Sequence, residues 1–440
     1  MSIILTPGHI EIAESEFIGR HPDTLSTCLA AELVYSIAAQ VHVQNSGLLS
    51  DYTKGKLLNP TTTHLQGIDA SVEESYGLEN LRADVNVQIS AINSKNIIPI
   101  PLRINLVGQI AAPQFQQTDL DQIVRETTFD VFSKAGYFLH GDFVPEYIKA
   151  DTQGVTAQSP NLNRTTQHNT FADSCVVYGH YIREPFGIDG TFPSLVIAKE
   201  IDRILEETAR QGTIPELRPD GKVHVSVVRE SKGYRIRDVY LSVAHSKNPG
   251  AAFREKIAAI ASQAISCYPG GEHAHITVNG GGNFNFYFVN ADSGISGKKD
   301  SVIVTGGIHQ LGTDGIWGKC LYKASSSALP YAFALSRAVC DVTGATYACV
   351  GVYTRYGQEQ AELILQDIDP KYESIRENIT RALRTLPRDR DGIRDLLNMK
   401  VNLNTYGTFN DVRGFHEPTK PWKSYNPNLA QALTKALSKP

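Results

Sequence analysis

The stretch QGTIPELRPDGKVHVSVVRESKGYRIRDVYLSVAH, residues 211–245, decides the fold class of this chain. Residues 222–230 alternate valine with more polar residues, which is the period of a half-buried strand. Residues 235–245 have the same character, and SKGY at 231–234 suits the turn between two antiparallel neighbours. The Pro-Asp-Gly step at 219–221, taken alone, is typical of a turn that opens such a hairpin. The stretch therefore predicts an antiparallel strand pair.

A helix is predicted directly after this strand pair. Residues 251–267 are amphipathic at helical spacing and stop before a Pro-Gly step. The same order of two strands and a long helix recurs about three times, which predicts an α+β fold built from three related units. The further predicted elements are helices at 24–41, 326–340 and 370–385, and strands at 283–290, 301–305, 346–353 and 361–367.

A polar segment interrupts this pattern. Residues 152–172, TQGVTAQSPNLNRTTQHNTFA, are rich in Thr, Gln and Asn and show no helical or strand period. Loops of this length in compact proteins are usually lids, binding loops or disordered segments. We therefore expect a mobile loop here.

Composition excludes several classes of protein. The chain has 440 residues, of which 41% are hydrophobic and 20% charged, so it can bury large cores. Lys plus Arg is 42 and Asp plus Glu is 46, and the resulting net charge of −4 disfavours a nucleic-acid partner held by bulk charge. No apolar run approaches the roughly 20 residues that a membrane span needs. The N-terminus lacks the pattern of a signal peptide and the six cysteines are scattered, so we expect a cytoplasmic protein with reduced thiols.

Glycines and lysines gather at residues 290–323, NADSGISGKKDSVIVTGGIHQLGTDGIWGKCLYK. Glycine lets backbone amides approach an anion closely, and lysine supplies a point charge for phosphate. The stretch contains no GxxxxGK[ST] motif, and its Lys298-Lys299 pair is expected just before a strand. A polyphosphate site and a solvated basic loop both fit this composition.

Two shorter motifs carry further candidate residues. RHPD at 20–23 places Asp23 near the start of the first predicted helix, where it could be a functional carboxylate or only a helix cap. LRPDGK at 217–222 opens a predicted strand and ends in Lys222.

These motifs together resemble those of the S-adenosylmethionine synthetase (methionine adenosyltransferase) family, and the resemblance covers almost the whole chain. The family's ESVSEGHPDK is similar to ESEFIGRHPDT at 14–24, and its NGTLPWLRPDAK to QGTIPELRPDGK at 211–222. Its GDCGLTGRK resembles ADSGISGKK at 291–299, and its GGGAFSGKDPSKVDRS aligns with GTDGIWGKCLYKASSS at 312–327. QSPNL, LSVAHS and the C-terminal YGTF…KPW match in the same order.

The resemblance implies a reaction and a site. Members of the family join methionine to ATP: the sulfur attacks ribose C5′, and the released tripolyphosphate is cleaved to pyrophosphate and phosphate. His21 would stabilise charge where C5′ meets the triphosphate. The implied catalytic set is His21, Lys222, Lys299 and Lys319, and the ATP-binding set adds Asp220 at the ribose, Phe284 on the adenine, Lys298 and Lys323. The substrate side would hold Gln109, Gln158, Asp173, Asp292 and Tyr356. Asp23 would bind Mg²⁺, and Asp84 aligns with the family's ligand for a monovalent cation such as K⁺.

The resemblance also implies an architecture. The family has three similar, interleaved α/β domains with pseudo-threefold symmetry. The corresponding domains here are 1–19 with 184–287, 20–161 with 288–328, and 162–183 with 329–440, and 152–170 match the family's mobile active-site loop. Two subunits pack sheet to sheet and share active sites, so a homodimer is expected, with a tetramer as the larger assembly of the family.

Several positions depart from the family pattern. The second Mg²⁺ ligand falls on Ser325, and a hydroxyl is a poorer ligand than a carboxylate. The acidic residue that faces the substrate ammonium falls on Gln109, and a small aliphatic residue beside the methionine falls on Tyr356. The glycine-rich IGGPMGD becomes the bulkier FYFVNAD at 286–292. The residues expected to bind the triphosphate thus match the family pattern, whereas those expected to bind the methionine differ from it.

Three functions stay open at this point. The first is S-adenosylmethionine synthesis from ATP and methionine. The second is an adenosyltransferase or tripolyphosphatase that uses another thioether or nucleophile. The third is a non-catalytic ATP-binding homologue that associates with a genuine synthetase, which the changes at Ser325 and Gln109 would suit.

Overall fold

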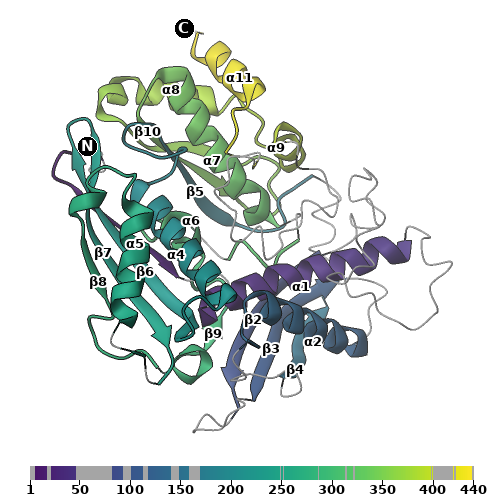
Figure 1. Ribbon diagram of the computed structural model, residues 1–440. Helices are drawn as coiled ribbons and strands as arrows, with labels where there is room; N and C mark the ends of the chain where they lie inside the picture. Colours follow the sequence, from purple (N-terminus) through teal and green to yellow (C-terminus); the bar gives the residue numbers. More distant parts are fainter. Residues whose placement is uncertain are drawn as a thin grey trace.

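The structure is a computed structural model that describes residues 5–16, 21–45, 82–92, 101–111, 117–139, 148–157, 169–247, 249–250, 252–285, 287–312, 315–320, 323–397, 399, 420 and 423–438. Its strands form three separate sheets covered by helices (Figure 1), which confirms the α+β fold class. None of the helices within these residues is long and apolar enough to cross a membrane.

The first sheet contains the hairpin that the sequence predicts. Its order is β1-β6-β7-β8, with β1 Ile10–Glu16, β6 Leu217–Glu230, β7 Gly233–His245 and β8 His275–Val278. β1 and β7 are antiparallel to β6, whereas β8 is parallel to β7. The helices α4 (Pro193–Gln211) and α5 (Phe253–Ile265) pack on it, because their apolar faces and the alternating valines of β6 form one buried cluster.

The second sheet repeats this pattern. Its order is β4-β3-β2-β9, with β2 Arg82–Ala91, β3 Leu102–Ala111, β4 Ile148–Ala157 and the short β9 Gly294–Ile295. β9 and β3 are antiparallel to β2, and β4 is parallel to β3. Its helices are α1 (Pro22–Asn45) and α2 (Gln117–Lys134).

The third sheet has the order β5-β10-β11, all antiparallel, with β5 Cys175–Ile182, β10 Tyr347–Thr354 and β11 Glu362–Ile368. The helices of this unit are α7 Ala324–Thr343, α8 Arg376–Leu383, α9 Arg390–Leu396 and α11 Pro427–Leu437. α7 crosses β5 at Gly179, where a Cβ atom would lie 2.1 Å from backbone atoms of the helix. Only glycine permits so close an approach.

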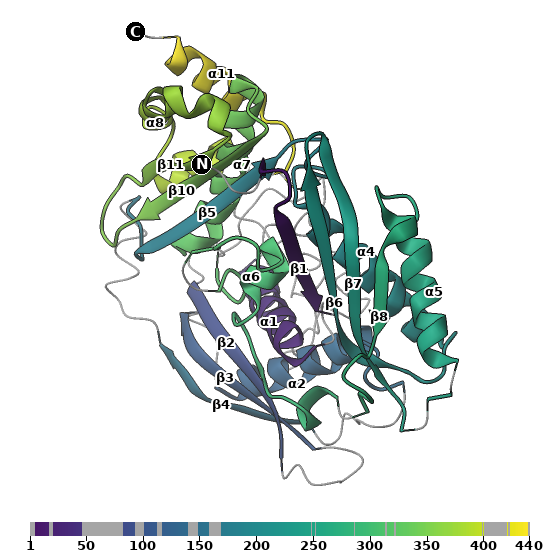
Figure 2. The ribbon, with the colours of Figure 1, turned by 90° about the vertical axis from the view of Figure 1, so that its left-hand side faces the viewer.

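The three units exchange their edge strands in a cycle. In chain order the units are α1-β2-β3-α2-β4, α4-β6-β7-α5-β8 and α7-β10-β11-α8. The strand that precedes each unit in the sequence belongs to the sheet of another unit. β1 precedes α1 but pairs with β6. In the same way, β5 precedes α4 but pairs with β10, and β9 precedes α7 but pairs with β2. β1 and α1 are therefore neighbours in the sequence but belong to different units (Figure 2), and the same holds for β9 and α7. The exact domain boundaries given above stay a prediction.

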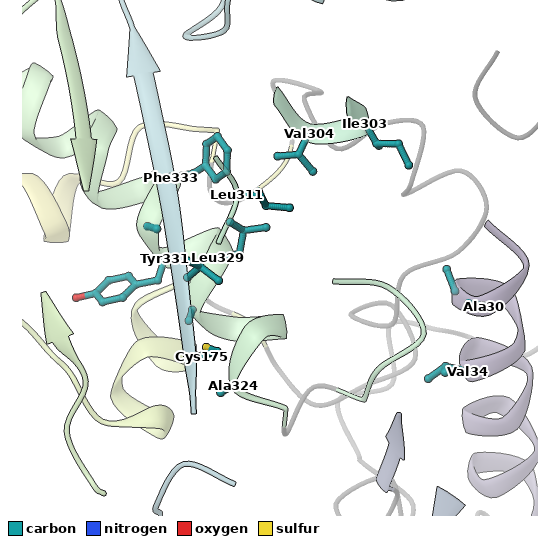
Figure 3. Packing of buried hydrophobic residues seen from close by; sticks show 14 of the residues in the cluster. Ala30, Val34, Cys175, Ile303, Val304, Leu311, Ala324, Leu329, Tyr331 and Phe333 are labelled. Atoms are coloured by element: carbon teal, nitrogen blue, oxygen red, sulfur yellow. The ribbon is translucent and has the colours of Figure 1, made fainter. Parts of the chain in front are cut away.

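A shared core joins the second and third units. It contains Ala30 and Val34 of α1, Leu329 and Phe333 of α7, and Val304 of α6 (Asp300–Thr305). Figure 3 shows Ala30 and Val34 on one side, Leu329 and Phe333 on the other, and Val304 near the top of the view between them. The first unit has its own apolar cluster around α4 and β6.

Several predicted elements are confirmed and two strands are wrong. The helices predicted at 24–41, 251–267 and 326–340 and the strands at 346–353 and 361–367 are present. Residues 301–305, predicted as a strand, form α6: their β-branched side chains pack into the core, and Gly306 ends the helix in a left-handed conformation. Residues 288–290, predicted within another strand, form the 3₁₀ turn η7, Phe288–Asn290, whose first N–H is bound by a side chain instead of a strand.

Three further local predictions are corrected. Residues 152–157 of the expected mobile loop belong to β4, an edge strand whose exposed face explains its polar composition. The predicted helix 370–385 is divided into the 3₁₀ turn η8 (Pro370–Ile375) and α8. The Pro-Asp-Gly step at 219–221 is no turn, because it lies inside β6, where the register with β7 shifts.

Candidate functional site

Charged residues face one another where β1 ends beside β6. In the antiparallel register, Glu16 lies opposite Lys222, and Glu14 lies opposite His224. Directly opposed residues on one face of a sheet bring their side chains together. The pairing thus places two carboxylates beside a lysine that the sequence had singled out.

The Glu16 carboxylate lies at the centre of this cluster. Its Oε1 atom is 2.8 Å from Nζ of Lys222 and 2.7 Å from Nζ of Lys299. Its Oε2 atom is 3.2 Å from Nδ1 of His21. Glu14 lies farther from the same two ammonium groups, with Oε1 at 3.6 Å from Lys222 and 3.4 Å from Lys299. Three predicted site residues are therefore brought together around Glu16: His21 just before α1, Lys222 of β6 and Lys299 in the turn before α6.

Burial controls the protonation of this cluster. Loss of solvent raises the pKa of the Glu16 carboxyl, although Lys222 and Lys299 oppose the shift. Burial also lowers the pKa of the His21 imidazole to about 3, with the neighbouring lysines as a second cause. The pKa of Lys299 is raised because the two glutamates outweigh the effect of burial. At neutral pH His21 is therefore uncharged, while Lys299 carries a positive charge.

Asp23 lies in the first turn of α1 and is completely buried. Its Oδ1 accepts a hydrogen bond of 3.0 Å from the backbone N–H of Ile295, so Asp23 is more than a helix cap. Its Oδ2 is 3.0 Å from Nζ of Lys298, which also lies 3.7 Å from Asp292. Lys298 and Lys299 immediately precede a helix rather than the predicted strand.

The residues here fit a divalent cation. Ligand atoms of Glu16, His21 and Asp23 all lie within 4.8 Å of one another. Oδ2 of Asp23 and both carboxylate oxygens of Glu16 are buried, and their partners are the side chains of Lys298 for Asp23 and of Lys222, Lys299 and His21 for Glu16. Carboxylate oxygens are the donors that Mg²⁺ prefers.

A second cluster of charged residues lies where α7 begins and beside β2. Nζ of Lys323 is 2.8 Å from Asp84 and 4.0 Å from Asp173. Asp84 lies opposite Gln109 of β3 on one side and opposite Lys319 on the other. The Asp84 carboxylate, predicted as a ligand for a monovalent cation, thus pairs with the ammonium of Lys323.

The other residues predicted near the second metal ion or the methionine differ in their exposure to solvent. Ser325 is buried in the first turn of α7. The Tyr356 side chain is 50% exposed in the turn after β10, and its backbone N–H bonds Oγ of Ser174, the residue after Asp173. Gln158 lies outside the described residues.

Asp220 and Phe284 lie near the ends of β6 and β7. Phe284 exchanges two hydrogen bonds of 2.9 Å with His245, whose Nε2 accepts its N–H. Asp220 is buried, and its Oδ2 accepts a 2.7 Å hydrogen bond from the backbone N–H of Phe288. Phe288 packs on Tyr137 with ring centroids 4.2 Å apart. Asp220 thus anchors the bulky segment that replaces the family's glycine-rich one.

We expect Asp220→Asn to stabilise the protein at alkaline pH. Burial raises the pKa of Asp220 to about 7 from an ordinary value of 3.8, so the folded state binds a proton more tightly than the unfolded state. This contribution to stability is complete below pH 4 and is lost as the pH rises to about 7. The amide keeps the acceptor for Phe288 without the charge, and should raise the free energy of unfolding at pH 8 by on the order of 3 kcal/mol.

Urea unfolding at pH 5 and pH 8 measures this effect. Asp238→Asn, which changes an exposed carboxylate on β7, should keep the wild-type difference between the two pH values. Equal stability of Asp220→Asn and wild type at pH 8 would refute the expectation.

The chain is similar to known proteins in part of its sequence and in its fold. No protein-family model matches the chain. It is 31% identical over 240 residues to the S-adenosylmethionine synthase of Clostridium acetobutylicum, covering 51% of this chain and 60% of that protein. It is 33% identical over 143 residues to the synthase of Thermus thermophilus, covering 31% and 36%. Its fold is similar to that of an unusual S-adenosylmethionine synthetase from Campylobacter jejuni, with a TM-score of 0.69 over 98% of this chain and all of that one, at 14% identity.

The chain is a divergent relative of the S-adenosylmethionine synthases. Its alignments span between about a third and three-fifths of the curated synthases it matches. The structural similarity shows the fold alone.

The sequence did not single out every member of the site of this synthase relative. Glu14, Glu16 and His224 were missed, as was Asp300, which accepts hydrogen bonds from Thr27 and Ile316 beneath the lysine pair. A signal for the two glutamates was present: their spacing of two residues puts both on one face of a strand that leads into the RHPD motif.

Proposed function

We propose that this chain is a methionine adenosyltransferase, which forms S-adenosylmethionine from ATP and methionine and hydrolyses the released tripolyphosphate to pyrophosphate and phosphate. The observation that carries the proposal is the convergence of Lys222, Lys299 and His21 at one buried point. The synthase names of the relatives agree with this reaction.

The lysines suit the chemistry of the leaving group. Tripolyphosphate leaves ribose C5′ with about four negative charges, so fixed cations that stabilise it lower the barrier. Lys222, Lys298 and Lys299 would hold the phosphates, with Lys319 and Lys323 nearer the second cluster. His21 is neutral and could donate a hydrogen bond to the departing oxygen without carrying charge itself. Mg²⁺ bound at Asp23 would neutralise charge on the phosphate oxygens.

The remaining roles are proposed by similarity. Asp220 and Phe284 would contact the nucleoside, and Asp173, Asp292 and Gln158 would line the methionine side. Gln109 lacks the charge that the family uses for the substrate ammonium, and the exposed ring of Tyr356 adds bulk there. We therefore keep a related thioether as the alternative sulfur substrate, with tripolyphosphatase activity or ATP binding without turnover as further alternatives. Asp84 stays the proposed ligand for a monovalent cation such as K⁺, which would have to replace the ammonium of Lys323 there.

A homodimer with shared active sites is part of the proposal. The face of the first sheet opposite its helices exposes Ile10 and Ile12 of β1 and Tyr240 of β7. On the second sheet, Val107 and Ile295 are exposed. Exposed apolar side chains gathered on sheets support sheet-to-sheet association.

Product identification tests this function. Purified protein with ATP, Mg²⁺ and methionine should form S-adenosylmethionine, pyrophosphate and phosphate, detected by mass spectrometry and ion chromatography. A panel of other thioethers tests the alternative substrate. Phosphate release without any adenosylated product would favour the tripolyphosphatase, and nucleotide binding without any product would favour the non-catalytic homologue.

A further inference from the structure

The lysines of the candidate site carry internal counter-ions. The ammonium groups of Lys222, Lys298 and Lys299 face the carboxylates of Glu14, Glu16 and Asp23, and the exposed Asp292 lies at the edge of the set. The cluster therefore offers no net positive charge to an incoming anion, although it contains three lysines.

Glu16 has the position and the surroundings of a bound anion. One of its oxygens bridges two ammonium groups at 2.7 and 2.8 Å, as a phosphate oxygen held by two lysines would. Its side chain is 1% exposed, so the contacts are shielded from water. Within the described part of the chain, no backbone N–H or hydroxyl group is among its partners, which are the side chains of Lys222, Lys299, His21 and Glu14.

A second buried glutamate of β1, Glu11, has neutral hydrogen-bond donors among its partners and serves as a comparison for Glu16. Oε1 of Glu11 accepts hydrogen bonds from the backbone N–H and the hydroxyl of Ser194, and its Oε2 pairs with Arg229. Glu11 is thus fixed by neutral donors as well as by charge, whereas Glu16 is held by the site residues alone.

We propose that Glu16 is an internal counter-anion of the polyphosphate site, which occupies the position between Lys222 and Lys299 in the empty protein and is displaced when a polyphosphate binds. The inference rests on the proposed function only in taking these lysines as phosphate ligands, and it does not require adenosyl transfer. Two internal ion pairs are lost on binding, so the protein binds polyphosphate more weakly than its lysines alone would allow. The chain thereby favours ligands with enough charge to replace the carboxylate, such as tripolyphosphate, over those with a single phosphate.

Calorimetric titration with inorganic tripolyphosphate in EDTA tests this role without metal or nucleotide. Glu16→Gln removes the competing charge and keeps the shape of the side chain, so it should bind tripolyphosphate at least about tenfold more tightly than wild type. Glu14→Gln, at the longer distances, should tighten binding by a smaller factor. Glu230→Gln, which removes one exposed charge at the far end of β6, should leave the affinity within about twofold of wild type.

The outcomes separate the possible roles of Glu16. If Glu16 only positions the lysines, Glu16→Gln binds more weakly. If it serves only as a metal ligand, the affinity in EDTA is unchanged, and either result overturns the proposal. Thermal unfolding checks that Glu16→Gln is folded. If it is not, the affinity of Glu14→Gln for tripolyphosphate is the test, and unchanged or weaker binding by that variant overturns the proposal. If neither the wild type nor the two variants bind tripolyphosphate, the proposal is also overturned. If Glu16→Gln binds tripolyphosphate more tightly but the protein forms no adenosylated product, only the proposed function is refuted.

Discussion

Lys222→Ala should lower the rate of adenosyl transfer by about 10²–10³-fold, which is the usual effect of removing one preorganised donor to a developing anion. Lys222 is the lysine of the cluster that comes from β6, and the hairpin with β7 holds its backbone firmly. Its charge cannot be supplied by Lys299 alone, because Lys299 would then be left with two carboxylates, Glu14 and Glu16. The loss should appear in kcat as well as in the affinity for ATP.

The measurement is the initial rate of product formation at saturating ATP. Lys232→Ala is the matched control, since Lys232 lies in the exposed turn of the same hairpin and should keep the wild-type rate. A folded Lys222→Ala protein with more than a tenth of the wild-type rate would contradict the assigned role of this lysine.

Glu11→Ala should lower the free energy of unfolding by about 3–5 kcal/mol, because it leaves the buried guanidinium of Arg229 without its counter-ion. Arg229 is among the largest fully buried side chains, and its other recorded partner is the backbone carbonyl of Phe186. The substitution also removes the acceptor for the first turn of α4 at Ser194. The junction of β1, β6 and α4 should therefore lose much of its stability.

Urea unfolding checks this value. Glu230→Ala breaks an exposed pair with Arg235 on the same hairpin and should cost less than about 1 kcal/mol. Replacing both members of the buried pair, as Glu11→Leu with Arg229→Met, should recover part of the loss, because no unpaired charge remains. A cost of Glu11→Ala no larger than that of Glu230→Ala would show that the buried pair contributes little.

The sequence predicts those parts of the fold in which a local pattern matches the final environment. Alternating valines identify β6 because one of its faces packs on α4. Residues 301–305 have the composition of a strand, and only the core around them makes α6 a helix. The strand at 152–157 was hidden by its polar residues, because an edge strand with an exposed face needs few apolar side chains.

In the candidate site, too, some residues can be predicted from local sequence and others depend on the tertiary structure. The lysines and His21 were predicted because they lie in motifs that can be aligned. Glu16 was missed because its role depends on the register that places β1 beside β6, two strands from distant parts of the chain. The pairing of Lys323 with Asp84 likewise depends on the meeting of α7 and β2. Contacts of this kind follow from tertiary structure and not from local spacing.

The cyclic exchange of edge strands bears on how this chain can change in evolution. The edge strand of each sheet comes from a segment that precedes another unit, so a contiguous piece of the chain that contains a complete sheet with its helices also contains elements of another unit. A unit cannot be deleted, duplicated or moved to another protein without leaving an open strand edge behind. The borrowed strand β1 also carries Glu14 and Glu16 into the site. Inheritance of the site and inheritance of the whole three-part fold are therefore tied together.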